Sequence, residues 1–204
     1  MIVIPEHNVE AQHKRSHPWT KTEYDDGAGK YYDFKAQPEL IRTVLEDFVP
    51  FNGEPAIQSF YNMLQWVNRP EGVLETNDCA FRGPEPHEDV LFRKALRASG
   101  RLQFFYRAPE YNLPLDGVRW LLRMFHIYLS LERRDVDYAV FETSICPTDF
   151  VLIGQSGSRL SVRFCAYGDS QAETFAMLDV AFAGLRRAFE RIDLAMSVQI
   201  PDYP

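Results

Sequence analysis

Residues 112–133 read NLPLDGVRWLLRMFHIYLSLER, and the rest of the chain must be arranged around this stretch. Its apolar residues recur at helical spacing, which predicts a helix of about six turns. They form two stripes, the first made of Val118, Leu121, Leu122, Phe125 and Leu129, and the second of Trp120, Met124, Ile127 and Leu131. A helix that is apolar on most sides is not suited to a surface. We therefore expect it to lie between two layers or against a partner chain.

A polar seam runs along the same helix, at spacings of 4, 3, 4 and 3 residues, and consists of Arg119, Arg123, His126, Ser130 and Arg133. Charged side chains on an apolar helix must reach water, carboxylates or a partner. Solvation with ion pairs inside the chain is the ordinary outcome, and an anion or phosphorylated-ligand site is the least expected one. The functional hypothesis is that Arg119, Arg123 and His126 bind an acidic partner protein. The ten Tyr and three Trp of the chain add weight to this hypothesis, because these residue types are enriched at protein interfaces.

Composition sets limits on the class of protein. A chain of 204 residues with 46% hydrophobic and 14% aromatic residues suits one ordinary domain. The net charge of −7 argues against nucleic-acid or anionic-membrane partners. No apolar run is long enough to span a bilayer, and the start MIVIPEH lacks the features of a signal peptide. Three cysteines without metal-ligand spacing indicate reduced thiols in a cytoplasmic protein, and we expect no cofactor.

The expected organisation is an N-terminal arm, residues 1–36, followed by a single domain, residues 37–204. The arm should contain a hairpin, with strands at 22–24 and 31–34 around a glycine-rich turn. The domain should open with a helical hairpin over 38–68, formed by helices at 38–49 and 55–68.

Beyond residue 72 the pattern alternates between strands and helices. Strands are predicted at 73–81, 101–108, 138–146, 150–154, 159–166 and 194–200, and helices at 87–98, 112–133 and 170–191. Ser170 and Glu173 have capping-box spacing at the start of the last helix. The fold class that follows is α+β, with an antiparallel or mixed sheet of about five to seven strands and long helices packed on it.

An internal echo accompanies this pattern. A shift of 58 residues aligns residues 101–140 with 159–198 without a gap, and further upstream the sequence around Glu75 resembles that around Glu142. The echo predicts a duplicated strand–strand–helix–strand unit, at 73–140 and 141–200. The alternative is two ordinary β-α-β stretches that share local signals.

Few residues in the sequence fit a catalytic or ligand-binding motif. Residues 27–30 lack the spacing of a phosphate loop, and His7, His13 and His17 have no predicted strand or helix to fix them around a metal. If the repeat is real, Glu75 and Glu142 could form a carboxylate pair, but we favour two solvent-facing strand residues. Cys79 and Cys146 are expected to be small apolar fillers, because no histidine is near them in sequence.

The function that these observations favour is a non-catalytic protein-binding domain of bacterial or phage type, such as an immunity-like inhibitor or adaptor. The grounds are the negative charge, the aromatic content and the lack of a short catalytic motif. One alternative is an enzyme or small-molecule-binding domain with dispersed site residues. Another is a structural subunit of a larger assembly, which would account for the aromatic N-terminal arm, and a homo-oligomer is a further option.

Overall fold

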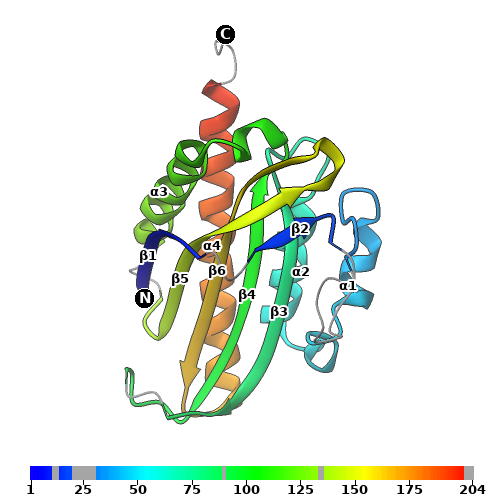
Figure 1. The fold of residues 1–204 in the computed structure, drawn as a ribbon. Helices are drawn as coiled ribbons and strands as arrows, with labels where there is room; N and C mark the ends of the chain where they lie inside the picture. The colour runs from blue at the N-terminus through cyan, green and yellow to red at the C-terminus, as the bar shows by residue number, and fades with distance from the viewer. Residues whose placement is uncertain (11–13, 20–30, 89–90, 133–135, 200–204) are drawn as a thin grey trace.

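The computed structural model describes residues 1–10, 14–19, 31–88, 91–132 and 136–199, with the backbone alone at 7, 8, 198 and 199. The fold is α+β, as predicted. A six-stranded mixed sheet has its helices on one face, and the opposite face of the sheet carries no helix among the described residues (Figure 1).

The sheet consists of β1 (Ile2–Val9), β2 (Arg15–His17), β3 (Leu74–Pro86), β4 (Leu96–Tyr106), β5 (Ala139–Phe150) and β6 (Gln155–Gly168). Its order is β1-β5-β6-β4-β3, and β2 pairs with the far end of β5. β1 and β2 run parallel to β5, whereas the other neighbours are antiparallel. Two long hairpins, β3–β4 and β5–β6, therefore meet along the central β4–β6 pair.

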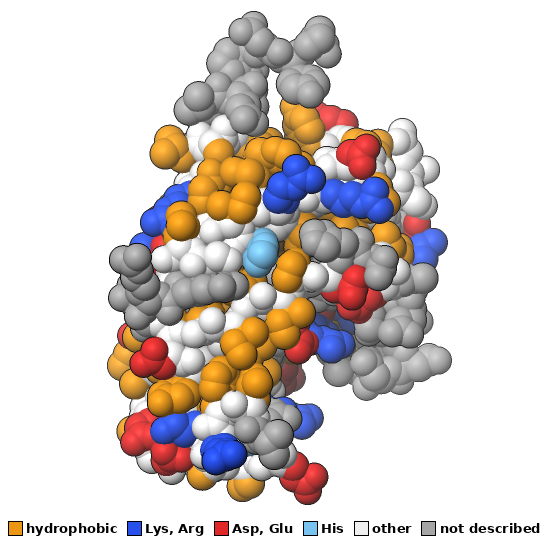
Figure 2. Space-filling view, turned by 90° about the vertical axis from the view of Figure 1, so that its left-hand side faces the viewer, with side chains coloured by type: hydrophobic (Ala, Val, Ile, Leu, Met, Phe, Trp, Pro, Cys, Tyr) orange, Lys and Arg blue, Asp and Glu red, His pale blue; other side chains and the backbone are white. Residues whose placement is uncertain are grey.

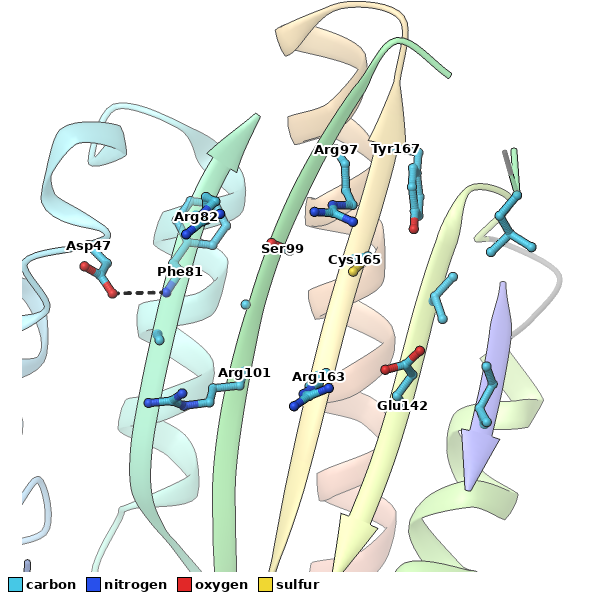
Figure 3. A pocket seen from close by; sticks show the side chains of 15 residues that line it. Asp47, Phe81, Arg82, Arg97, Ser99, Arg101, Glu142, Arg163, Cys165 and Tyr167 are labelled. Carbon is cyan, nitrogen blue, oxygen red and sulfur yellow. Dashed lines mark hydrogen bonds between the residues drawn. The ribbon is translucent and has the colours of Figure 1, made fainter. Parts of the chain in front are cut away.

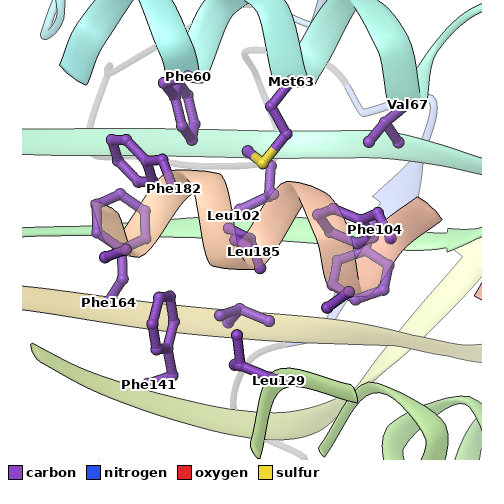
Figure 4. Packing of buried hydrophobic residues seen from close by; sticks show 14 of the residues in the cluster. Phe60, Met63, Val67, Leu102, Phe104, Leu129, Phe141, Phe164, Phe182 and Leu185 are labelled. Atoms are coloured by element: carbon purple, nitrogen blue, oxygen red, sulfur yellow. The ribbon is translucent and has the colours of Figure 1, made fainter. Parts of the chain in front are cut away.

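The helices are α1 (Ile41–Val44), α2 (Pro55–Val67), α3 (Leu115–Leu131) and α4 (Gln171–Gln199). α4 lies over the central strands, between α2 and α3 (Figures 1 and 4). The capping residues predicted at its start are in place. The backbone N–H of Glu173 donates to Ser170 Oγ at 3.2 Å, and the Glu173 carboxylate accepts the N–H of Asp169 at 2.8 Å.

The hydrophobic core fills the space between the helices and the sheet. Figure 4 shows Phe182 and Leu185 of α4 pointing at the side chains of α2 and of the central strands. The ring of Phe182 lies 4.8 Å from that of Phe60 and 5.0 Å from that of Phe164. α4 therefore packs against both α2 and the sheet, and its removal would expose most of the core.

α3 lies at the surface, which differs from the expectation. Its first stripe is buried, and Phe125 and Leu129 are fully inaccessible. Its second stripe is divided, because Trp120 and Met124 are partly buried against the core, whereas Ile127 is 45% exposed and Leu131 is 61% exposed. The helix therefore buries one face only, and the expectation that it lies between two layers of this chain is wrong.

The N-terminal residues are part of the sheet rather than an arm. β1 pairs with residues 140–145 of β5, and β2 pairs with residues 148–150. The strand predicted at 31–34 is irregular backbone and turn. The first strand and the turn of the predicted hairpin lie outside the described residues.

The helix predicted over 38–49 is broken into short pieces. α1 has four residues, flanked by 3-10 turns at Pro38–Leu40 and Val49–Phe51. The break puts Phe48 inside, where its ring stacks on Phe60 at 4.7 Å and on Phe81 at 5.0 Å. Burial of this ring outweighs the helix propensity of the segment. The helix predicted over 55–68 is confirmed as α2.

Three further element predictions are wrong. The strand predicted at 150–154 is a 3-10 turn at Val151–Ile153 that follows the end of β5 at Phe150. Residues 96–98, assigned to a helix, begin β4, with Ala98 facing the core and its neighbours facing outward. Residues 194–199 continue α4 instead of forming a strand. No Gly or Pro interrupts the chain between Gly184 and Pro201, and buried Ile192 extends the helical stripe of Leu185 and Phe189.

The predicted repeat unit is not supported. Strand–strand–helix occurs twice, as β3-β4-α3 and β5-β6-α4, but only the first is followed by a strand. The matched strands β4 and β6 are antiparallel neighbours. The alternative, shared local signals, accounts for the echo equally well. No helix of the described residues has the length and apolar character needed to cross a membrane.

Candidate functional site

The open face of the sheet contains a hollow of about 900 Å³ (Figure 3). We call it the arginine hollow, because its lining includes Arg82, Arg97, Arg101 and Arg163. The acidic residues of its lining are Glu142 and Asp47. The lining holds four guanidinium groups and two carboxylates, and two further carboxylates, Glu85 and Asp78, pair with Arg82 and Arg101.

Strand register arranges the side chains of the hollow in three rows. Across β4 and β6 these rows are Arg97 opposite Tyr167, Ser99 opposite Cys165, and Arg101 opposite Arg163, with Glu142 of β5 beyond Arg163. Figure 3 shows Ser99 and Cys165 between the arginines of the two outer rows. Alternate residues of a strand face the same side, so adjacent rows are about 6.7 Å apart. On β3, Arg82 lies opposite Ser99 and Glu85 lies opposite Arg97, so each of the three rows contains an arginine.

The arginines differ in how far they are neutralised inside the chain. Arg101 donates from Nε and Nη2 to the same oxygen of Asp78, at 3.0 and 2.9 Å. Arg82 has a longer ion pair, 3.4 Å, with Glu85, and its side chain is 71% exposed. For Arg163 no ion pair is found among the described residues, and its side chain is exposed. Arg163 lies opposite Arg101 on one side and opposite Glu142 on the other, so it has one like-charged and one oppositely charged cross-strand neighbour.

Aromatic residues close one end of the hollow. Tyr167 is 4% exposed, and its ring packs against His87 and Phe92 of the β3–β4 connection. Lys94 lies over the ring of Tyr138 and bonds Asp169 at 2.6 Å. This bond raises the pKa of Lys94 and lowers that of Asp169.

The N-terminal segment, residues 14–19, lies at the other end. Asp78 joins it to the hollow, because the oxygen that binds Arg101 also accepts Arg15 Nη1 at 2.8 Å. The indole N–H of Trp19 donates to the carbonyl oxygen of Asn77 at 3.1 Å. β2 therefore docks on the sheet through side chains as well as through its pairing with β5.

Glu75 is the centre of a buried polar cluster beneath this segment. Its carboxylate is 3.1 Å from Nε2 of His17 and 2.5 Å from Nζ of Lys35. The other ring nitrogen of His17 is 3.0 Å from Oδ1 of Asn77. Burial, and next to it the nearby carboxylates, raise the pKa of Tyr31, whose ring packs edge-on against His17. Because every nitrogen of the imidazole is bonded inside the protein, the cluster fits a structural role.

The positions of Glu75 and Glu142 decide between the two interpretations made from the sequence, which were a carboxylate pair and two solvent-facing strand residues. Glu75 is 3% exposed on β3, whereas Glu142 is exposed on β5, and two strands separate them. They do not form a carboxylate pair. The solvent-facing interpretation holds for Glu142 and is wrong for Glu75, because the carboxylate of Glu75 is buried against His17 and Lys35, which are distant in sequence.

Two of the three cysteines are packing residues. Burial raises the pKa of the Cys79 thiol well above its usual value and also raises that of Cys146. Both therefore remain protonated near neutral pH. Cys165 instead lines the hollow, in its middle row.

The seam predicted from the sequence lies on the outer face of α3, away from the hollow. Arg119 and Arg123 are exposed and His126 is half-buried. Arg119 has one ion pair within its own helix, 3.5 Å from Asp116, whose side chain is 95% exposed. Such an exposed pair contributes little. Figure 2 views the side that carries β1 and α3 and shows groups of hydrophobic side chains with Lys or Arg side chains and a histidine among them.

His7, His13 and His17, for which the sequence did not favour metal binding, are not seen together in the part of the chain that the structure describes. His17 is committed to Glu75 and Asn77, the side chain of His7 is not described, and His13 lies outside the described residues. No group of three or more His, Cys, Asp or Glu side chains in the described ranges could hold a metal ion.

Sequence reasoning missed the arginine hollow because it placed residues 87–98 in a helix. As a strand, residues 96–106 alternate between an outward set that contains Arg97, Ser99 and Arg101 and an inward set that contains Ala98 and Leu102. That alternation is readable from the sequence. The meeting of β4 with β6 is not, because strand order depends on contacts distant in sequence.

Comparison of the chain with models of protein families, with curated proteins and with solved structures found no match in any of the three searches. The geometry of this chain must therefore carry the functional argument alone. Guanidinium groups along an open concave surface are suited to binding carboxylates, which they contact with paired N–H donors.

Proposed function

We propose that this protein is a non-catalytic protein-binding domain, of the immunity-like inhibitor or adaptor class, that holds an acidic segment of a partner protein in the arginine hollow. The observation that carries the proposal is the exposed Arg163 directly opposite Arg101 in the hollow. Arg101 is bonded to Asp78, whereas no ion pair of Arg163 is found among the described residues. An anionic partner would supply a carboxylate to Arg163.

The shape of the surface favours a protein segment over a small molecule. Ligand pockets bury most of a small ligand, whereas this hollow is an open depression on a sheet. Phosphate sites commonly use free backbone N–H groups at a helix N-terminus or a nest. The residues that line the hollow come largely from paired strands, whose N–H groups bond neighbouring strands. Guanidinium groups are the donors that remain.

Electrostatics also favour the hollow over the seam on α3. Concave surfaces lined by one sign of charge focus the field, whereas exposed arginines on a convex helix are well solvated. The seam formed by Arg119, Arg123 and His126 remains a proposal for a second contact with the same partner. Arg-rich surfaces of this kind mainly set the association rate and its salt dependence.

Fluorescence anisotropy with defined probes tests the proposal. A labelled oligo-glutamate peptide should bind at low salt, and an oligo-lysine peptide and an oligothymidine of equal length should bind much more weakly. The double variant Arg82→Glu/Arg163→Glu should abolish binding of the glutamate peptide. Both side chains are exposed, so the variant should remain folded, which circular dichroism melting verifies.

The matched control is Arg119→Glu/Arg123→Glu, which makes the same charge change on α3. Weaker binding in the hollow variant together with nearly unchanged binding in the α3 variant supports the hollow. The reverse result would move the function to the α3 seam. Equal binding of the oligothymidine would contradict the choice of a protein partner.

A further inference from the structure

We infer that Glu142 determines the charge pattern that the arginine hollow accepts, so that the bound segment carries a basic residue beside the acidic residue that binds Arg163. The inference rests on the proposed function and narrows the chemistry of the partner segment from acidic to mixed in charge. It makes Glu142 a specificity-determining residue of the same site.

Most charged side chains that line the hollow already interact within the chain. Asp47 accepts the backbone N–H of Phe81 at 3.4 Å (Figure 3), and the other residues engaged in this way are Arg82, Arg97 and Arg101. Among the described residues no ion pair or hydrogen bond is found for the side chains of Arg163 and Glu142, and both are exposed. One cation and one anion of the lining are therefore available to a ligand.

These two available charges are direct neighbours. Glu142 of β5 lies opposite Arg163 of β6, and Figure 3 shows the two side chains next to each other on the open face. Neighbouring strands are about 4.8 Å apart. A ligand group that binds Arg163 therefore lies close to the carboxylate of Glu142 as well.

This position of Glu142 disfavours a uniformly acidic segment. A ligand carboxylate on Arg163 is repelled by the Glu142 carboxylate, and the repulsion becomes stronger where the ligand excludes water. A Lys or Arg side chain next to the ligand carboxylate replaces this repulsion by attraction. A segment of mixed charge therefore satisfies both Arg163 and Glu142, whereas a purely acidic segment satisfies only Arg163.

The attraction between Glu142 and Arg163 themselves does not prevent ligand binding. Ion pairs between exposed side chains contribute little, because water solvates both charges and ordering two long side chains costs entropy. The two residues form no ion pair in this structure although they are cross-strand neighbours. Ligand charges can therefore interact with both side chains at a small cost.

An extended segment presents the required pair of charges at every second residue. Its alternate side chains face the same side and are about 6.7 Å apart. Lys and Glu have long side chains that span the difference between this distance and the strand separation of about 4.8 Å. The expected pattern is a basic residue, any residue and an acidic residue.

Three labelled seven-residue peptides provide the test. The first is oligo-glutamate, and in the other two its central residue is replaced by Lys or by Gln. Dissociation constants are measured by anisotropy at low salt. The Lys peptide should bind about threefold more tightly than the Gln peptide, because it alone places a cation over Glu142.

A variant cycle assigns this preference to Glu142. In Glu142→Gln the Lys peptide should lose its advantage over the Gln peptide, and oligo-glutamate should bind about threefold more tightly than it binds the parent protein. The matched control is Glu71→Gln, which makes the same change at an exposed position on the turn between α2 and β3, outside the lining. It should leave all three affinities unchanged. Circular dichroism melting establishes that both variants are folded.

Each outcome is distinct. Equal affinity of the Lys and Gln peptides for the parent protein, with oligo-glutamate binding abolished in Arg82→Glu/Arg163→Glu, would overturn the role of Glu142 and leave the proposed function standing. A preference for Lys that persists in Glu142→Gln would likewise overturn the assignment to Glu142. Failure of all three peptides to bind would overturn both the inference and the proposed function.

Discussion

Truncation of Phe182 to Ala should lower the free energy of unfolding by about 4 kcal/mol. The ring is 1% exposed and lies where α2, α4 and β6 meet, with Phe60 and Phe164 as its aromatic partners at 4.8 and 5.0 Å. Burial of a phenylalanine contributes about 1.5–3 kcal/mol. Each aromatic pair adds about 0.5–1.5 kcal/mol. One burial contribution and two aromatic pairs, each taken at the middle of its range, give about 4 kcal/mol, which lies within the usual range for truncating a buried phenylalanine.

Urea unfolding followed by circular dichroism gives the measurement. For a domain of this size a loss of 4 kcal/mol corresponds to a fall in Tm of about 10 °C. Phe182→Leu, which retains most of the volume, should cost about 1.5 kcal/mol. Ile127→Ala, on the outer face of α3 where the side chain is 45% exposed, should cost less than about 1 kcal/mol. If Phe182→Ala lowered the free energy of unfolding no more than Ile127→Ala, the result would contradict the packing of Phe182 between α2 and the sheet.

Three further predictions concern the sheet. Gly100→Ala should destabilise by about 2 kcal/mol, because its Cβ would lie 2.4 Å from a backbone oxygen of β3; an unchanged urea midpoint would refute the close approach. Glu75→Gln should lower the free energy of unfolding by about 3 kcal/mol, because it removes the buried carboxylate beside His17. Limited proteolysis should then cut the variant before β3 sooner than the parent protein, and equal digestion of both would refute the structural role of Glu75. In folded protein at pH 8 iodoacetamide should modify Cys79 more slowly than Cys165, because desolvation raises the pKa of the Cys79 thiol well above its usual value and leaves little thiolate. Mass spectrometry of the tryptic peptides measures this, and equal labelling of both cysteines would contradict it.

Local signals predicted most of the elements correctly. The buried stripe of α3 follows from apolar spacing alone, and so does the inward face of α4 around Phe182. The element predictions are wrong where contacts between residues distant in sequence determine the local structure. Phe48 breaks a helix because two aromatic partners from other elements bury it, and residues 194–199 stay helical because α4 has a core to cover.

The candidate site was harder to predict for the same reason. Arg101 and Arg163 are 62 positions apart in the sequence and become direct neighbours only through the pairing of β4 with β6. The α3 seam was visible because one helix carries all of its residues. A site assembled from several strands has no such local pattern, and only the alternation along each strand hints at it.

NMR spectra of the arginine Nε–Hε groups test the central claim most directly. When the oligo-glutamate peptide is titrated into the protein, the signals of Arg82 and Arg163 should shift together and saturate at one ligand per chain. The signals of Arg119 and Arg123 should remain in place. Shifts confined to Arg119 and Arg123, or shifts of all exposed arginines in proportion to the added charge, would contradict the assignment of binding to the arginine hollow.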